Sequence, residues 1–503
     1  MVNKLQSLAK DTAIYGLSSI IGRFLNYCLV PLHTWKISAA SGGYGIVSNL
    51  YAWSALLFVV LTFGMETTFF RFANKVDEDQ RLVYSTALRL VGGVGVLFVV
   101  LVLCLLSPIA GAMGYAAHPE YIACFAIIGA MDAFQAIMFA RLRQQHRPLK
   151  FMVLKMLFIV VNIVLNLIIF LVLPLLFDRF PIVQSFYERF NYGVGLIFFA
   201  NLFCTFIVFF GFIKELKGIT FGFDRRLAGR MFGYAWPILL LGLVGILGQV
   251  FDKIAFTKLV PGEEGFVQLG IYGACVKIAM IMTMLTQAFR YAYEPFVFGG
   301  SNDKNSPAML AAGMKYFIIF TLLAFLAVVF YMPVLKYLIA NHNYWVGLRV
   351  VPIVMAGEIF MGIYFNLSFW YKLTDQTWWG AIMSAVGAAV MIGINVVFVP
   401  RIGYMACAWG VFGGYLVSML LSYFIGQKKY PIHYPLKDIA LYVIVFAVLW
   451  AVSQCFGKMN IVLNFILCTL LLCVYVAFIV KRDIPLQSIK TAFGSLKRKL
   501  GKK

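Results

Sequence analysis

The sequence predicts an all-α integral membrane protein with about fourteen transmembrane helices. Hydrophobic residues make up 62% of its 503 residues, charged residues only 12%, and the mean hydropathy is +0.89. A soluble protein of this length needs more charge to cover its surface. The apolar residues form unbroken runs of roughly 20, the length at which an α-helix crosses a bilayer. A membrane β-barrel would instead show alternating segments of about ten residues.

Turns that carry proline, glycine or charge separate these apolar runs. The first run follows Lys4 and Lys10. It exceeds the roughly 7–15-residue core of a signal peptide, so we predict a retained helix. The expected spans are residues 11–33, 44–66, 84–106, 119–140, 151–175, 191–213, 235–258, 268–289, 315–332, 350–371, 377–399, 404–426, 438–456 and 460–480.

The lysines and arginines predict the orientation in the membrane, because basic connections stay in the cytoplasm. With the N-terminus inside, inner segments hold 29 of the 42 basic residues, outer segments hold 8, and five lie within spans. Both termini are therefore expected in the cytoplasm. The same excess explains the net charge of +22 through contact with an anionic inner leaflet and without nucleic acid.

A long basic connection between Lys214 and Arg230 divides the predicted spans into six and six, with two more following. The motif Gly42-x-Tyr44-Gly45 recurs 228 residues later as Gly270-x-Tyr272-Gly273. Duplicated helix sets are typical of transporters, although chance similarity of two apolar stretches is the alternative. The expected parts are an N-terminal lobe (1–213), a cytoplasmic linker (214–229), a C-terminal lobe (230–426), two extra spans (427–482) and a cytoplasmic tail (483–503).

The tail pattern predicts a basic amphipathic helix lying on the anionic leaflet, with a disordered tail as the alternative. Its apolar positions recur every three or four residues, and lysine or arginine fills most of the remaining surface. The apolar residues are Leu486, Ile489, Phe493, Leu496 and Leu500.

Charged residues within spans are costly and point to a shared polar cavity. Arginine and lysine at mid-depth favour an anionic group such as a pyrophosphate, whereas acids offer a site for Na⁺ or H⁺. The predicted substrate-binding residues are Arg23, Asn26, Lys253 and Lys277; the predicted ion-coupling or cavity acids are Asp132, Asp252 and Glu358; the candidate gate residues are Glu66, Arg290 and Glu294.

Structural roles compete with these assignments. Arg23 could instead neutralise Asp132 as a buried pair, and Glu66 could mark a helix boundary. Asp252 and Lys253 are sequence neighbours, which point in different directions on a helix, so we expect them not to pair with each other. The nine cysteines and five histidines form no metal-ligand spacing. We therefore predict packing cysteines, no metal and no resident cofactor.

Several motifs bear on the family. They are Tyr15–Arg23, Pro31–Thr34 with Tyr44-Gly45, Phe63–Glu66 with Arg71-Phe72, Asp252–Ile254 with Gly270–Tyr272, and Phe289–Phe296. Together these segments resemble the polysaccharide flippases of the multidrug/oligosaccharidyl-lipid/polysaccharide exporter superfamily.

The resemblance implies two six-helix lobes that alternate access to a cationic cavity, and an undecaprenyl-pyrophosphate-linked oligosaccharide as cargo. The lipid II flippases of the superfamily are the main alternative, because they also have fourteen helices and an arginine in the first helix, which Arg23 matches. A multidrug exporter is a less favoured alternative, because that branch normally has twelve helices and the two extra spans count against it. The expected setting is the bacterial inner membrane, with envelope glycan biosynthesis enzymes as co-workers.

We expect no enzymatic activity. The largest external connection, around Asp178 to Asn191, holds no histidine and no nucleophile–base arrangement. An envelope glycan-modifying enzyme and a solute carrier of another fold are the remaining alternatives.

Overall fold

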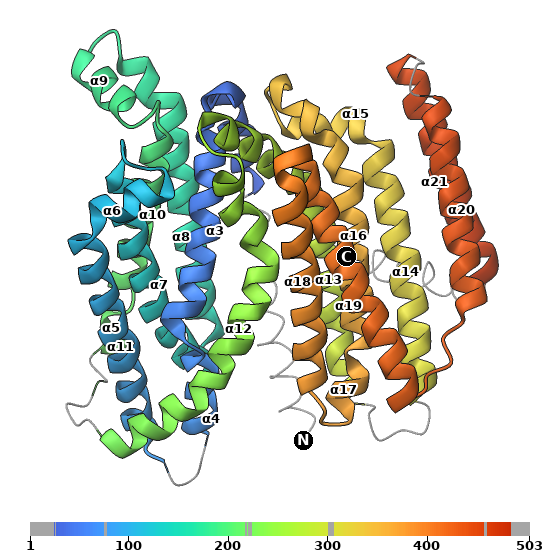
Figure 1. The fold of residues 1–503 in the computed structure, drawn as a ribbon, viewed down its shortest axis with the longest axis horizontal. Helices are drawn as coiled ribbons and strands as arrows, with labels where there is room; N and C mark the ends of the chain where they lie inside the picture. Colours follow the sequence, from blue (N-terminus) through green and yellow to red (C-terminus); the bar gives the residue numbers. More distant parts are fainter. Residues whose placement is uncertain are drawn as a thin grey trace, which may run out of the picture. The chain divides into compact units, whose positions relative to one another are not determined.

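The computed structural model describes residues 25, 27–74, 78–216, 219, 224–299, 306–456 and 460–483. These residues form helices joined by short turns, and no strand occurs among them (Figure 1). The predicted first span, 11–33, and the predicted amphipathic tail lie largely outside the described residues. Both remain predictions.

The α-helices are α2 (Leu29–Lys36), α3 (Gly43–Thr62), α4 (Met65–Ala73), α5 (Gln80–Cys104), α6 (Leu106–Met113), α7 (Pro119–Gln144), α8 (Pro148–Leu167), α9 (Pro181–Arg189), α10 (Val194–Phe210), α11 (Ile213–Leu216), α12 (Arg225–Leu259), α13 (Glu263–Gly299), α14 (Ser306–Phe330), α15 (Met332–Leu335), α16 (Val350–Leu367), α17 (Phe369–Leu373), α18 (Trp378–Ile402), α19 (Met405–Lys429), α20 (Leu436–Cys455) and α21 (Ile461–Asp483). Short 3-10 turns lie at Ala39–Ser41, Leu173–Leu176, Lys336–Leu338 and His342–Arg349, and a π-helical turn at Ile168–Val172.

Local signals in the sequence explain where several helices begin. Pro119 and Pro148 occupy the first positions of α7 and α8, where a missing N–H costs nothing. The Asp79 carboxylate caps α5 by accepting from the Arg81 N–H at 2.9 Å. Asp224 caps α12 in the same way, accepting from the Arg226 N–H at 2.8 Å.

Membrane spans dominate the described residues. Twelve helices among them are long and apolar enough to cross a membrane, and the bent pair of α9 and α10 brings the number to thirteen. Each of the thirteen predicted spans from 44–66 onward overlaps one of these. Large side chains such as Leu97 (60% exposed) and Leu175 (78% exposed) lie on the helix surfaces, as expected for helices in lipid. An all-α membrane protein with about fourteen spans is therefore confirmed.

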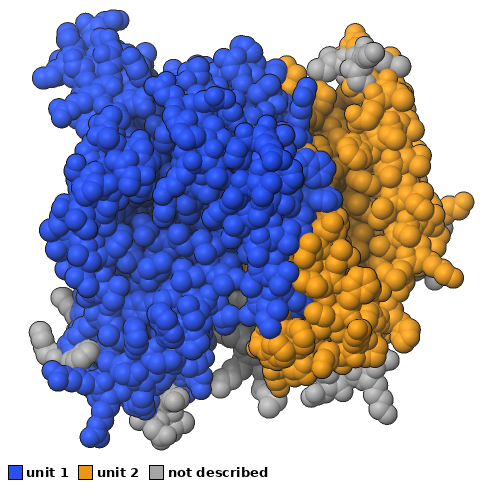
Figure 2. All heavy atoms as spheres, in the orientation of Figure 1, with its two compact units in different colours: residues 1–277, 338–350, 381–414 blue, residues 278–337, 351–380, 415–503 orange. Residues whose placement is uncertain are grey.

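The described chain forms two compact units (Figure 2). Unit 1 comprises residues 1–277, 338–350 and 381–414, and unit 2 comprises residues 278–337, 351–380 and 415–503. The lobe boundaries that the sequence predicts remain a prediction. In unit 1, α7 packs against α3, α5, α8 and α10, and α3 also packs against α12.

An aromatic-rich core joins α4, α5, α7, α8, α10 and α12 within unit 1. Phe69, Tyr84 and Phe212 lie in it and are almost completely buried. The ring centroids of Phe139 and Phe212 are 4.8 Å apart in an edge-to-face arrangement. Such aromatic pairs add stabilisation beyond the area they bury.

Unit 2 attaches its last two helices to α14 through ion pairs at one end of the bundle. The Lys315 ammonium on α14 lies 3.2 Å from the Asp438 carboxylate on α20 and also contacts the Asp483 carboxylate on α21. The Arg482 guanidinium lies 2.6 Å from the other Asp438 oxygen. The charges of two cations and two carboxylates therefore neutralise each other where these three helices meet.

Candidate polar transport site

Arg23 and Asn26, two of the predicted substrate-binding residues, lie outside the described residues. Their roles remain predictions, and so does the alternative pairing of Arg23 with Asp132.

Asp252 and Lys253, on α12, form an ion pair with each other. The Lys253 ammonium lies 2.9 Å from one Asp252 oxygen and 3.0 Å from the other. The Tyr272 hydroxyl on α13 donates to the same carboxylate at 2.8 Å. The expectation that these neighbours do not pair is wrong, because the four-carbon lysine stem folds back to the adjacent carboxylate. Asp252 is only 2% exposed, so the pair offsets a charge that would be costly alone.

Lys277 occupies the midpoint of the span Glu263–Tyr291 and is half-buried. No ion pair or hydrogen bond joins it to any residue that the structure describes. Lys277 interacts electrostatically with Lys253 and with His33. All three residues belong to unit 1. An ammonium held at bilayer depth with no acidic partner among the described residues is an arrangement that an anion would stabilise.

His33 contributes to a buried polar network that the sequence analysis did not single out. Its Nε2 lies 2.8 Å from the Asn166 side-chain oxygen on α8. The Asn166 amide in turn donates to the Asn162 backbone carbonyl at 2.8 Å. The two asparagines lie four residues apart in an apolar run, a spacing that could have indicated a polar face. A π-helical turn, Ile168–Val172, directly follows them, as is common near functional sites.

Asp132 is half-buried at mid-depth in α7. It accepts a long hydrogen bond, 3.4 Å, from the Thr205 hydroxyl on α10. Gln135, one turn along α7, donates to the Thr205 backbone carbonyl at 3.0 Å. Lys155 on α8 lies within electrostatic range of Asp132. The carboxylate therefore belongs to a polar patch inside unit 1.

The candidate gate residues fall in different units. Glu66, at the start of α4, forms an ion pair with Arg143, near the end of α7, and both belong to unit 1. Arg290 and Glu294 belong to unit 2.

Glu358, one of the predicted cavity acids, lies half-buried in α16 and belongs to unit 2.

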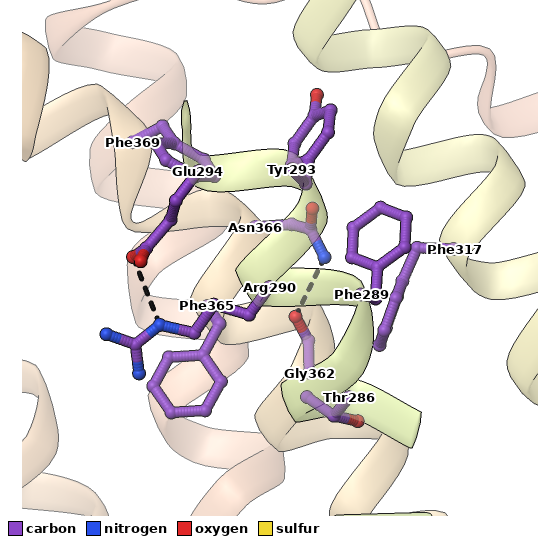
Figure 3. A pocket seen from close by; sticks show the side chains of 10 residues that line it. All are labelled: Thr286, Phe289, Arg290, Tyr293, Glu294, Phe317, Gly362, Phe365, Asn366 and Phe369. Atoms are coloured by element: carbon purple, nitrogen blue, oxygen red, sulfur yellow. Dashed lines mark hydrogen bonds and ion pairs between the residues drawn. The ribbon is translucent and has the colours of Figure 1, made fainter. Parts of the chain in front are cut away.

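Arg290 and Glu294 lie at the edge of a pocket in unit 2 (Figure 3). The Glu294 carboxylate lies 3.0 Å from the Arg290 Nε and 3.1 Å from the Lys372 Nζ on α17. The Arg290 guanidinium also covers the Phe365 ring at 5.0 Å. Partial burial opposes ionisation of Glu294, but hydrogen bonds and charge from Lys372 and Arg290 outweigh it and lower its pKa. Glu294 is therefore an ionised bridge between two cations.

The pocket beside this bridge is walled mainly by aromatic rings. Thr286 and Asn366 face it from α13 and α16, and the Thr286 hydroxyl and the Asn366 carbonyl oxygen are buried without a hydrogen-bond partner. Polar atoms left in this state are normally satisfied by a small bound molecule such as water. Among the described residues, no three His, Cys, Asp or Glu side chains are grouped to hold a metal ion.

The family model described as "Polysaccharide biosynthesis protein" matches residues 8–292, more than half of the chain. The chain belongs to the polysaccharide biosynthesis protein family. No curated protein matches it individually.

Solved structures establish the fold of this family member. The lipid II flippase MurJ, in an inward-closed conformation, matches with a TM-score of 0.73 at 13% identity, over 93% of this chain and 99% of that one. An inward-facing multidrug resistance MATE family transporter of the MOP superfamily matches with a TM-score of 0.60 at 16% identity, over 83% of this chain and 94% of that one.

A MOP superfamily transporter from Pyrococcus furiosus matches with a TM-score of 0.52 at 16% identity, over 84% of this chain and 95% of that one. At these identities the likenesses concern the fold, which is that of the MOP superfamily transporters. The predicted superfamily is confirmed, and the chain is a multi-pass membrane protein with a transporter fold.

Proposed function

We propose that this protein is a flippase that moves a lipid-linked oligosaccharide, carried on undecaprenyl pyrophosphate, from the inner to the outer leaflet for cell-envelope polysaccharide synthesis. The observation that carries this proposal is Lys277, an ammonium at mid-membrane that no described residue neutralises. A pyrophosphate passing through the bilayer needs such a counter-charge. The family to which the chain belongs supports a saccharide as the attached group.

In the proposed mechanism, Lys277 and Arg23 hold the pyrophosphate while access alternates between the two leaflets. Lys253 takes part only if the cargo competes with Asp252 for its ammonium, since the two form a closed pair in this structure. In this proposal the side-chain amide of Asn26 also binds the substrate. Both termini lie in the cytoplasm, and the membrane is the bacterial inner membrane.

Coupling to a Na⁺ or H⁺ gradient is part of the proposal. Asp132 and Glu358 are the preferred acids, because both are half-buried within spans. Asp252 is less suited, since its carboxylate already accepts from Lys253 and Tyr272.

Lipid II is the second candidate cargo. The likeness to MurJ extends over 93% of this chain, compared with 83% for the multidrug transporter. We rank it second because the family description names polysaccharide biosynthesis.

Depleting the protein in cells should test the choice of cargo. We expect the lipid-linked oligosaccharide to accumulate on the cytoplasmic leaflet, measured by its protection from a membrane-impermeant glycosidase. Accumulation of lipid II instead would favour the second candidate. An unchanged distribution of both, with loss of a glycan modification, would favour an enzyme.

A further inference from the structure

The two Gly-x-Tyr-Gly motifs that recur in the sequence lie against each other in the structure. Gly42–Gly45 is at the start of α3, Gly270–Gly273 is in α13, and both belong to unit 1. A Cβ atom on Gly270 would lie 2.9 Å from the backbone nitrogen of Gly45. One on Gly273 would lie 2.3 Å from the Ser48 hydroxyl. The motifs therefore form one tight helix–helix contact.

The closest approach in this contact involves Gly45. A Cβ there would lie 1.9 Å from the Phe266 carbonyl oxygen, and one on Gly42 would lie 2.9 Å from the Phe266 Cβ. Gly42 also has φ +66°, which favours glycine. The obstacle at Gly45 is backbone, so a side chain there cannot be accommodated by a rotamer change. Alanine at Gly45 would force α3 and α13 apart.

A chain of hydrogen bonds reinforces the contact. The Tyr115 hydroxyl, in the turn after α6, donates to the Asn49 side-chain oxygen at 2.8 Å. The Asn49 amide donates to the Lys253 backbone carbonyl on α12 at 2.7 Å. Asn49 is only 1% exposed. Two hydrogen bonds therefore link α3 to the turn after α6 and to α12 beside the glycine contact.

The tyrosines of the two motifs hold neighbouring segments. Tyr44 packs edge-to-face on Tyr344, with ring centroids 6.1 Å apart, and the Tyr344 hydroxyl donates to the Ile37 carbonyl at 3.0 Å. Tyr272 binds Asp252, as described above. Both motifs thus combine glycines that permit close backbone approach with a tyrosine that anchors a neighbour, the pattern by which small residues join membrane helices.

We propose that the paired Gly-x-Tyr-Gly motifs are the outer seal of the transporter, which closes the path to the outer face and separates when cargo leaves. The distribution of lysine and arginine places residues 34–43 and 259–267 on the outer side, next to both motifs. The seal joins a helix from each predicted lobe. Contact between glycine backbones requires little interlocking of side chains, so the surfaces can part without repacking a core. This inference rests on the transporter function but not on the identity of the cargo.

Cys275 provides a natural reporter for the seal. It lies two residues after Gly273, is 0% exposed, and its thiol lies 3.3 Å from the Tyr344 carbonyl oxygen. In a full-length variant that keeps Cys275 and replaces the other eight cysteines, a membrane-impermeant maleimide added outside should label it slowly. The label should react faster whenever the seal opens more often.

Gly45→Ala should increase the rate of Cys275 labelling from outside and reduce transport, because closure is blocked by backbone. Gly245→Ala is the matched control, since that helical glycine of unit 1 has no atom within 4 Å of its would-be Cβ. It should label like the parent. Asn49→Leu is the milder variant, because it removes the Asn49–Lys253 hydrogen bond that joins the two predicted lobes beside the seal. It should label about 2- to 10-fold faster, the ratio expected for losing one hydrogen bond.

Asn49→Leu also tests the proposal if Gly45→Ala fails to accumulate in the membrane. Parental labelling rates in both variants would overturn the proposal, as would faster labelling only from the cytoplasmic side. If labelling responds as expected but lipid-linked saccharide is not moved, the seal stands and the proposed cargo fails.

Discussion

Replacing Lys277 by glutamine should reduce transport of the lipid-linked saccharide by about 10- to 100-fold, the loss expected when one charge-assisted hydrogen bond to a phosphate disappears. No described residue pairs with Lys277, so the substitution leaves no buried carboxylate behind and should not lower protein abundance. Lys277→Arg should retain part of the activity because it keeps the positive charge. The measurement is the initial transport rate, normalised to the amount of protein in the membrane.

Lys258→Gln is the matched control for this experiment. Lys258 is exposed at the last turn of α12, and its substitution should leave transport at the parental rate. Parental transport by Lys277→Gln would refute the role of this ammonium. So would a loss that merely follows a lower protein level.

Removing one partner of the Asp252–Lys253 pair should destabilise the protein strongly. Lys253→Met leaves a carboxylate that is 2% exposed without its counter-ion, which costs about 3–5 kcal/mol in comparable buried pairs. Asp252→Asn leaves the ammonium alone in the same surroundings. The double variant removes both charges and keeps a side-chain acceptor for Tyr272, so it should recover most of the lost stability. The thermal unfolding midpoint of the purified protein in detergent measures all three.

The double-variant cycle separates this ion pair from independent roles. If the double variant lost as much stability as the two single variants together, the charges would not be coupled. Recovery of stability without recovery of transport would show that the pair also serves the transport cycle.

The membrane spans could be predicted from the sequence because each depends on a local property, a run of apolar residues long enough to cross the bilayer. Their ends were less accurate. The predicted span 235–258 lies in a helix that begins at Arg225, because Asp224 caps a basic turn that continues the helix beyond the apolar run. Apolar periodicity does not register such a polar extension.

Contacts between distant segments could not be predicted in the same way. His33 and Asn166 are 133 residues apart, and no sequence pattern indicates that α2 and α8 adjoin. The repeated Gly-x-Tyr-Gly motifs were visible in the sequence, but their mutual contact depends on how α3 and α13 pack. The directions of the Cβ atoms alone do not predict the Asp252–Lys253 pair, because the long lysine side chain can reach the carboxylate of its sequence neighbour.

The most direct test of the proposed function is a leaflet assay with the purified protein in vesicles. The vesicles would carry undecaprenyl-pyrophosphate-linked oligosaccharide confined to one leaflet, and a membrane-impermeant glycosidase would report its arrival in the other. We predict redistribution that depends on the protein and is largely lost with Lys277→Gln. Redistribution no faster than in protein-free vesicles, under both Na⁺ and H⁺ gradients, would contradict the proposed flippase function.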